Sequence, residues 1–254
     1  MPHNVKVTII QTDIKWDSIG DNIKSADTLL AGAPQSDVYV LPEMWATGFN
    51  VKPNDSMFGD EPLEWMKHTA EKRQCAICGS LAVKTTGGTL HNRLYFVLPD
   101  GSYYFYDKHH LFTYGGENKH FTPGNKRVVA EYKGVRFLLL TCYDLRFPVW
   151  SRYRDDYDAI ILTANWPASR QEVWNILIKA RAIENQCYVI GANRTGQDPT
   201  CNYIGGSAII DAKGRVMEQA NGTGEQTVTA DLNPGMLYEF RKKFPVLNDR
   251  DILT

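Results

Sequence analysis

The sequence lacks long apolar runs and a charge of one sign. No apolar run in its 254 residues approaches the roughly 20 residues that a membrane-spanning helix needs. Lys and Arg number 28 against 29 Asp and Glu, so the formal net charge of −1 predicts no basic surface for nucleic acid or an anionic membrane. The segment Met1–Val7 leads into a strand pattern without the basic and apolar regions of a secretory signal. We therefore expect a cytoplasmic protein that binds neither nucleic acid nor membranes.

Cysteine is also scarce: the chain has five, at positions 75, 78, 142, 187 and 201. An odd number in a chain without an export signal indicates reduced thiols. Cys75 and Cys78 form a CxxC motif, which in other settings binds a metal or carries redox chemistry. No second pair accompanies it, and in the strand expected here positions i and i+3 point to opposite faces. We interpret this pair as core packing.

The apolar pattern predicts an α/β fold in one domain. Strands are expected at 5–11, 37–43, 75–84, 92–98, 103–106, 135–141, 159–165, 187–193, 206–211, 215–219 and 226–231. Helices are expected from Ile19 to about Gly32, at 61–73, from about Pro148, at 169–186 and near the end of the chain. The two halves repeat one plan with no linker between them. We predict a single domain over 1–254, a four-layer α-β-β-α sandwich of two mixed sheets, with 240–254 as a C-terminal tail.

Cys142 stands where the apolar run 135–141 meets a polar turn. A thiol at the carboxyl end of a buried strand is held rigidly near backbone N–H groups, which suits a nucleophile. A buried structural cysteine is the alternative. Two further ionisable residues end strands in the same way, Glu43 after 37–42 and Lys108 after the aromatic run 103–106. Because ligand sites in α/β sheets gather at such ends, we expect these three side chains to meet.

Glu, Lys and Cys together can perform acyl transfer. A carboxylate takes the proton of the thiol during attack and returns a proton to the leaving amine. An ammonium and the N–H of Tyr143 can stabilise the oxyanion, each such donor contributing roughly 3 kcal/mol. A histidine base is the rival, and His109 and His110 directly follow Lys108, although only one of them can share the direction of the lysine.

Three segments resemble the signature motifs of the nitrilase superfamily of carbon–nitrogen hydrolases. They are Leu41-Pro42-Glu43-Met44, Tyr106-Asp107-Lys108-His109-His110-Leu111-Phe112 and Thr141-Cys142-Tyr143-Asp144-Leu145-Arg146-Phe147-Pro148. Segments 117–124, 164–167 and 179–186 are similar to further family segments, in family order. The resemblance covers essentially the whole chain.

The resemblance implies an α-β-β-α fold, a homodimer, and no metal or organic cofactor. It makes Glu43 the general base and acid, Lys108 the oxyanion stabiliser and Cys142 the nucleophile that forms a thioester. Glu117 matches the auxiliary glutamate of the family. Its alternative reading is a charged residue in a glycine-rich loop.

Within the superfamily, the sequence from Cys142 to Pro148 is similar to that of the omega-amidase group, and 244–251 is similar to the tail of its bacterial members. That group deamidates short alpha-keto acid amides such as alpha-ketoglutaramate and alpha-ketosuccinamate. Typical nitrilases are longer and have Cys-Trp-Glu, from which Cys142-Tyr143-Asp144 departs. Hydrolysis of N-carbamoyl amino acids or polyamine precursors, acyl transfer to another acceptor, and a catalytically silent binding protein on this fold are the alternatives.

A substrate that bears a carboxylate needs a cation and a pocket wall. Arg146, Arg170 and Arg194 are the candidate cations, and structural roles are the alternative for each. The candidate substrate-binding residues are Tyr143, Phe112, Tyr114, Trp166 and Arg146, for which the alternative is packing in the protein interior.

Overall fold

Two six-stranded mixed sheets form the centre of the computed structural model, which describes residues 3–251. The first has the order β14 (Gln226–Leu232), β1 (Val5–Gln11), β2 (Val38–Val40), β3 (Ala76–Lys84), β4 (Leu90–Val97), β5 (Tyr103–Asp107). The second has the order β13 (Val216–Gln219), β12 (Ala208–Ile210), β9 (Tyr188–Asn193), β8 (Ala159–Ala164), β7 (Val135–Thr141), β6 (Val129–Tyr132). A separate hairpin joins β10 (Thr195–Gln197) to β11 (Asn202–Ile204).

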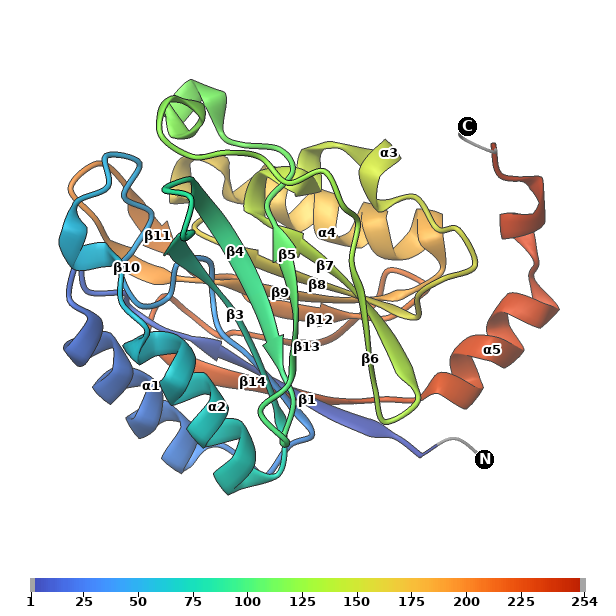
Figure 1. The fold of residues 1–254 in the computed structure, drawn as a ribbon. Helices are drawn as coiled ribbons and strands as arrows, with labels where there is room; N and C mark the ends of the chain where they lie inside the picture. The colour runs from blue at the N-terminus through green and yellow to red at the C-terminus, as the bar shows by residue number, and fades with distance from the viewer. Residues whose placement is uncertain (1–2, 252–254) are drawn as a thin grey trace.

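Helices cover the outer face of each sheet, as Figure 1 shows. Helices α1 (Ile19–Gly32) and α2 (Glu61–Arg73) lie on the first sheet, and α4 (Gln171–Asn185) lies on the second. The short α3 (Pro148–Ser151) follows β7, and α5 (Pro234–Lys243) follows β14. This arrangement is the predicted four-layer α-β-β-α sandwich.

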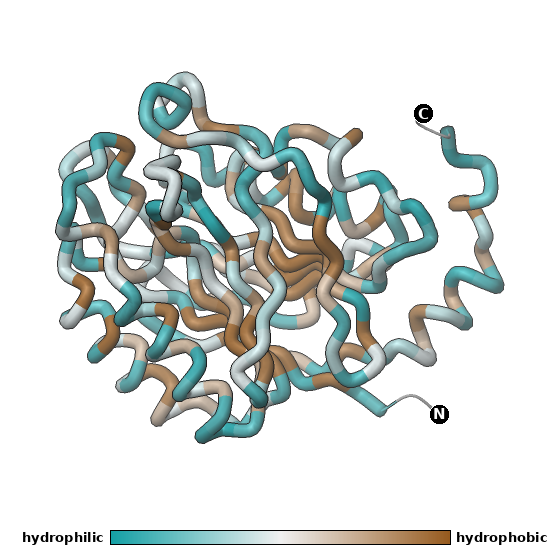
Figure 2. Tube along the Cα trace, in the orientation of Figure 1, coloured by the Kyte–Doolittle hydropathy of each residue, from teal (hydrophilic) through white to brown (hydrophobic). Residues whose placement is uncertain are grey.

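Apolar side chains from both sheets fill the space between them, and the central strands are the most hydrophobic part of the trace (Figure 2). Val7 and Ile9 of β1 share this core with Phe137 and Leu139 of β7, and all four are fully buried. One further core lies between each sheet and the helices that cover it. Strands buried on both faces explain the continuous apolar runs of the sequence.

The predicted repeat of plan between the two halves is confirmed in the strand pairing. From β14 to β5 successive pairs are antiparallel, parallel, parallel, antiparallel and antiparallel, and from β6 to β13 the same series recurs. Strands β1, β2 and β3 thereby correspond to β7, β8 and β9. Two of the candidate catalytic residues, Glu43 and Cys142, follow the parallel strands β2 and β7, whereas Lys108 follows the antiparallel edge strand β5.

Several elements differ from the sequence prediction. The helix expected from Pro148 is only the single turn of α3, because residue 152 leaves the helical conformation. A 3-10 helix over Cys142–Arg146 precedes α3. The strands β6, β10 and β11 were not predicted. Helix α5 and a 3-10 turn at Val246–Asp249 order much of the predicted tail, whose residues 252–254 lie outside the described range.

The described residues bear on the CxxC motif and on membrane-spanning helices. Cys75 and Cys78 are fully buried in different cores, one between the sheet and its helices and one between the sheets, which confirms the packing interpretation of the CxxC motif. Within residues 3–251 no helix has both the length and the apolar character needed to cross a bilayer.

Candidate active site

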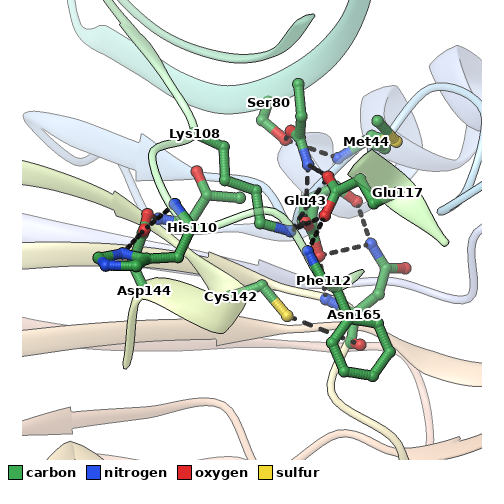
Figure 3. A network of polar contacts seen from close by, with 12 residues as sticks. Glu43, Met44, Ser80, Lys108, His110, Phe112, Glu117, Cys142, Asp144 and Asn165 are labelled. Carbon is green, nitrogen blue, oxygen red and sulfur yellow. Dashed lines mark hydrogen bonds and ion pairs between the residues drawn. The ribbon is translucent and has the colours of Figure 1, made fainter. Parts of the chain in front are cut away.

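Three strand ends bring Glu43, Lys108 and Cys142 together (Figure 3). Glu43 lies shortly after β2, Lys108 directly follows β5, and Cys142 directly follows β7. The first two residues thus come from one sheet and Cys142 comes from the other. Glu117, which the sequence placed in a loop, stands at the start of a short 3-10 turn, Glu117–Lys119, and points into the same cluster.

The Lys108 ammonium lies between two carboxylates. Its Nζ donates to Glu43 Oε1 at 2.8 Å and to Glu117 Oε2 at 2.9 Å. All three side chains are fully buried. Since a buried charge without a partner is strongly disfavoured, the two carboxylates and the ammonium depend on one another for their placement.

Two polar residues of the sheet, which sequence reasoning missed, complete this cluster. Asn92 Nδ2 donates to Glu43 Oε1 at 2.8 Å and to Glu117 Oε1 at 3.1 Å. Ser80 donates to Asn92 Oδ1 and accepts from the N–H of Met44, the residue after Glu43. A signal existed, because Ser80 and Asn92 are small polar residues inside expected strands, where a polar side chain needs a partner.

Asn165 links Glu43 to the Cys142 thiol. Its backbone N–H donates to Glu43 Oε2 at 2.9 Å, and its side-chain Nδ2 donates to the Glu43 carbonyl at 2.6 Å. The Cys142 thiol lies 3.9 Å from the Asn165 carbonyl oxygen and points toward it. Asn165 directly follows β8, so the second sheet supplies both the thiol and the groups that orient Glu43.

The ionisation of these groups follows from burial and charge. Burial raises the pKa of the Cys142 thiol well above its ordinary value, and the charge of Glu43 raises it further, while Lys108 opposes the shift. Burial alone would lower the pKa of Lys108, but Glu117 and Glu43 outweigh it and raise that pKa. Burial raises the pKa of Glu117, and Lys108 counteracts it. The raised pKa favours the protonated thiol, so a nucleophilic attack by Cys142 would require a base.

The backbone is strained after β2 and after β7. Cys142 has φ +46° and Met44 has φ +45°, in the left-handed region that residues other than glycine seldom adopt. Such conformations cost about 1–3 kcal/mol each and are concentrated at functional sites. In the first turn of the 3-10 helix that begins at Cys142, the N–H of Tyr143 has no partner within the helix. It is thus available to an oxyanion next to the thiol.

Asp144 joins the lysine segment to the cysteine turn. Its buried carboxylate accepts from the Thr141 N–H at 2.9 Å and from the Tyr106 hydroxyl at 2.8 Å. It also accepts from the His110 N–H at 3.0 Å and contacts His110 Nδ1 at 2.8 Å. Tyr106 and His110 flank Lys108 along the chain, so a single carboxylate fixes the segments that carry both Lys108 and Cys142.

The two histidines contact groups other than the thiol. His110 stacks on Phe147 at 3.9 Å and His109 stacks on Trp150 at 3.7 Å. His109 Nδ1 lies 2.6 Å from the Gly124 carbonyl oxygen. The geometry therefore favours Glu43 over a histidine as the base.

A cavity of about 390 Å³ opens at Cys142. Its lining includes all of the candidate substrate-binding residues, Tyr143, Phe112, Tyr114, Trp166 and Arg146. Trp166 is almost fully buried, whereas Tyr114 is 89% exposed and can contact a ligand only at the cavity mouth. The placement of these residues is compatible with the predicted role, which stays a prediction.

The three candidate cations differ in whether they reach the cavity. Arg146 and Arg170 line the cavity. Arg194 is fully buried elsewhere, where it donates to Asp13 at 3.1 Å and to the carbonyl oxygen of Ile14 at 2.9 Å. Its guanidinium holds chain segments together, so it is not available as a carboxylate clamp.

A family model described as carbon–nitrogen hydrolase matches residues 6–242. The chain is 42% identical to omega-amidase YafV of Escherichia coli (strain K12), over 97% of both chains. It is 35% identical to 2-oxoglutaramate amidase of Bacillus subtilis (strain 168), over 96% of both. A solved structure of a Xanthomonas campestris CN-hydrolase superfamily protein, XC1258, with an arsenic adduct in its active site, aligns with a TM-score of 0.95 and 35% identity over 99% of both chains.

Proposed function

The chain belongs to the carbon–nitrogen hydrolase family, and we propose that it is an omega-amidase. It hydrolyses the terminal amide of short alpha-keto acid amides, such as alpha-ketoglutaramate and alpha-ketosuccinamate, to the acid and ammonia. Two relatives that align over nearly their whole length carry the names omega-amidase and 2-oxoglutaramate amidase. The observation that carries the proposal is the half-buried Cys142 at a cavity, backed by the fully buried Glu43, Lys108 and Glu117.

In the first half of the reaction, Cys142 attacks the carbonyl carbon of the amide. Glu43 accepts the thiol proton as the sulfur–carbon bond forms, because the raised pKa of the thiol leaves little thiolate at neutral pH. The Lys108 ammonium and the Tyr143 N–H stabilise the resulting oxyanion. Glu43 then protonates the leaving nitrogen, the carbon–nitrogen bond breaks, and ammonia departs from a thioester.

In the second half, water takes the place of the ammonia. Glu43 accepts a proton from this water, which adds to the thioester carbon, and Lys108 again stabilises the oxyanion. The carbon–sulfur bond breaks, Glu43 returns the proton to Cys142, and the acid is released. Glu117 and Asn92 hold Glu43 and Lys108 in place through hydrogen bonds during both halves.

The cellular setting and assembly belong to the same proposal. We place the enzyme in the cytoplasm as a homodimer. Exposed apolar side chains support a partner surface, among them Ile176 and Ile183 on α4 and Phe244 after α5, each more than half exposed. Light scattering on the purified protein tests the dimer, and a monomer at micromolar concentration would rule it out.

A substrate panel tests the activity. Purified protein is assayed for ammonia release from alpha-ketoglutaramate and alpha-ketosuccinamate, from N-carbamoyl amino acids, and from aliphatic nitriles. The proposal predicts the highest kcat/KM for the two alpha-keto amides. A preference for carbamoyl compounds or nitriles would contradict it, and an inert protein with an unreactive Cys142 would favour a silent binding protein. Added hydroxylamine reports acyl transfer, because a hydroxamate product shows that acceptors other than water reach the thioester.

A further inference from the structure

The charge of the cavity lining is one-sided. Three ionised side chains line the cavity, Lys52, Arg146 and Arg170, and all of them are basic. No Asp or Glu among the described residues lines it. Because the whole chain is nearly neutral, this excess is a property of the cavity and not of the composition. Such a lining favours an anionic ligand.

Aromatic side chains hold both guanidinium groups in place. Arg146 lies over the Trp166 ring at 5.1 Å, and Arg170 lies over the Phe112 ring at 5.4 Å. Arg146 comes from the 3-10 helix that begins with the nucleophile, and Arg170 precedes the first residue of α4. Stacking on a ring restrains a guanidinium and leaves its edge N–H groups free to donate.

Neither guanidinium has an acceptor in the described part of the protein. Arg146 and Arg170 donate no side-chain hydrogen bond and form no ion pair with residues 3–251, although both are half-buried. The other half-buried arginines of the described residues all donate to a protein acceptor, as Arg93 does to Asp107 at 2.6 Å. Two restrained, unpaired guanidiniums in one cavity indicate a ligand that supplies the acceptors.

An alpha-keto acid has more acceptor oxygens than one edge of a guanidinium can bind. Its carboxylate and adjacent keto group present three oxygens close to one plane, whereas one edge of a guanidinium donates two parallel hydrogen bonds. We propose that Arg170 is a specificity-determining residue that binds the acid end of the substrate alongside Arg146. This inference rests on the proposed function, which it deepens by assigning the selection of anionic amides to the residue directly before α4.

A structural role for Arg170 is the alternative to be excluded. The Phe112 ring under Arg170 belongs to the residue whose N–H donates to Glu117 Oε2 at 2.6 Å. Loss of the stacking contact would therefore disturb Glu117 and lower turnover of every amide. A binding role affects only those substrates that carry the anion, so the two roles have different kinetic signatures.

Kinetics of Arg170→Gln on two amides of equal chain length distinguish these roles. The substrates are alpha-ketoglutaramate and pentanamide, which lacks the acid end. The proposal predicts that KM for alpha-ketoglutaramate rises about tenfold or more, because the variant loses one charge-assisted hydrogen bond to the substrate. It predicts little change in kcat. The kinetics with pentanamide stay unchanged, and Arg170→Lys recovers part of the lost affinity. The matched control is Arg154→Gln, at an exposed arginine outside the cavity, which changes neither substrate.

Equal losses on both amides would overturn the proposal in favour of the structural role, and unchanged kinetics on both would overturn it as well. A second probe needs no turnover. Binding of 2-oxoglutarate, the product of the proposed reaction, is measured by calorimetry in the Cys142→Ala background. We expect Arg170→Gln to weaken this binding about tenfold or more. Unweakened binding, or none in the parent, contradicts the inference. If the wild-type protein releases no ammonia from alpha-ketoglutaramate but Arg170 still controls 2-oxoglutarate binding, the proposed function fails and the anion site stands.

Discussion

Glu43 and Glu117 share their hydrogen-bond donors: Lys108 Nζ and Asn92 Nδ2 each donate to both carboxylates. Two carboxylates thus surround one ammonium in a fully buried cluster. Charge alone disfavours ionising both, and burial raises the pKa of Glu117. The arrangement keeps Glu43 oriented toward the thiol while Glu117 holds the lysine.

Glu43→Gln removes the proposed base and retains its shape. Because the pKa of the Cys142 thiol is raised, no other route provides enough thiolate, and we expect kcat to fall by about 10²–10⁴. Ammonia release measures this fall, and the variant should fold normally by circular dichroism. Glu184→Gln, at a glutamate of α4 outside the cluster, is the matched control. A variant with more than a tenth of wild-type kcat would show that Glu43 is not the base.

Lys108→Met leaves two buried carboxylates without their cation. Breaking a buried ion pair in this way costs about 3–5 kcal/mol, so unfolding in urea should begin at a clearly lower concentration. Adding Glu117→Gln removes one of the stranded charges and should restore part of the stability. The role of Lys108 as an electrostatic support is wrong if the single variant is as stable as the wild type, or if the second change lowers stability further.

Glu117 makes the stability of the protein depend on pH with a defined sign. Its pKa is raised above 4.5 in the folded state, so between 4.5 and that raised value the folded protein binds more protons than the unfolded chain. The contribution of Glu117 to stability therefore falls as the pH rises through this window. We expect the difference in unfolding free energy between the wild type and Glu117→Gln to decrease over this range in urea titrations. A constant or increasing difference would contradict the raised pKa.

Asp144→Asn tests the link between the lysine and cysteine segments. The substitution replaces a charged acceptor of hydrogen bonds from Thr141, Tyr106 and His110, each worth about 1.5–3 kcal/mol. We expect a fall in kcat of about tenfold or more with a smaller change in KM, together with slower alkylation of Cys142. Asp211→Asn, in the turn between β12 and β13, is the control for the loss of a turn carboxylate. Loss of stability without any change in alkylation rate would indicate a structural role alone.

The sequence was most informative where apolar runs are long. The continuous apolar run over 135–141 predicted β7 at its full extent, because a strand buried on both faces is apolar throughout. The helical spacing of apolar residues over 61–73 predicted α2. Short edge strands such as β10 and β11 were missed since their few residues show no period. The helix after Pro148 was overestimated, because proline favours a helix start and says nothing of its length.

The residue pattern alone brought together only the strand-end residues of the candidate site, and the family resemblance added Glu117. Glu43, Lys108 and Cys142 stand at the ends of recognisable runs, and topology brings such ends together. Asn92 and Asn165 orient Glu43 through contacts between strands distant in the sequence, and a local pattern does not name the partner of either residue. The choice among the arginines likewise required the three-dimensional arrangement, because Arg194 is paired internally and Arg170 is not.

The central claim is that Cys142 performs nucleophilic catalysis on the amide of an alpha-keto acid. Its most direct test is the rate of ammonia release from alpha-ketoglutaramate by the wild-type and Cys142→Ala proteins, measured side by side at equal, verified folded concentration. The account predicts robust release by the wild type and a loss of at least about 10³-fold in the variant, since without the thiol no thioester forms. Comparable release by Cys142→Ala, or none by the wild type, would contradict it.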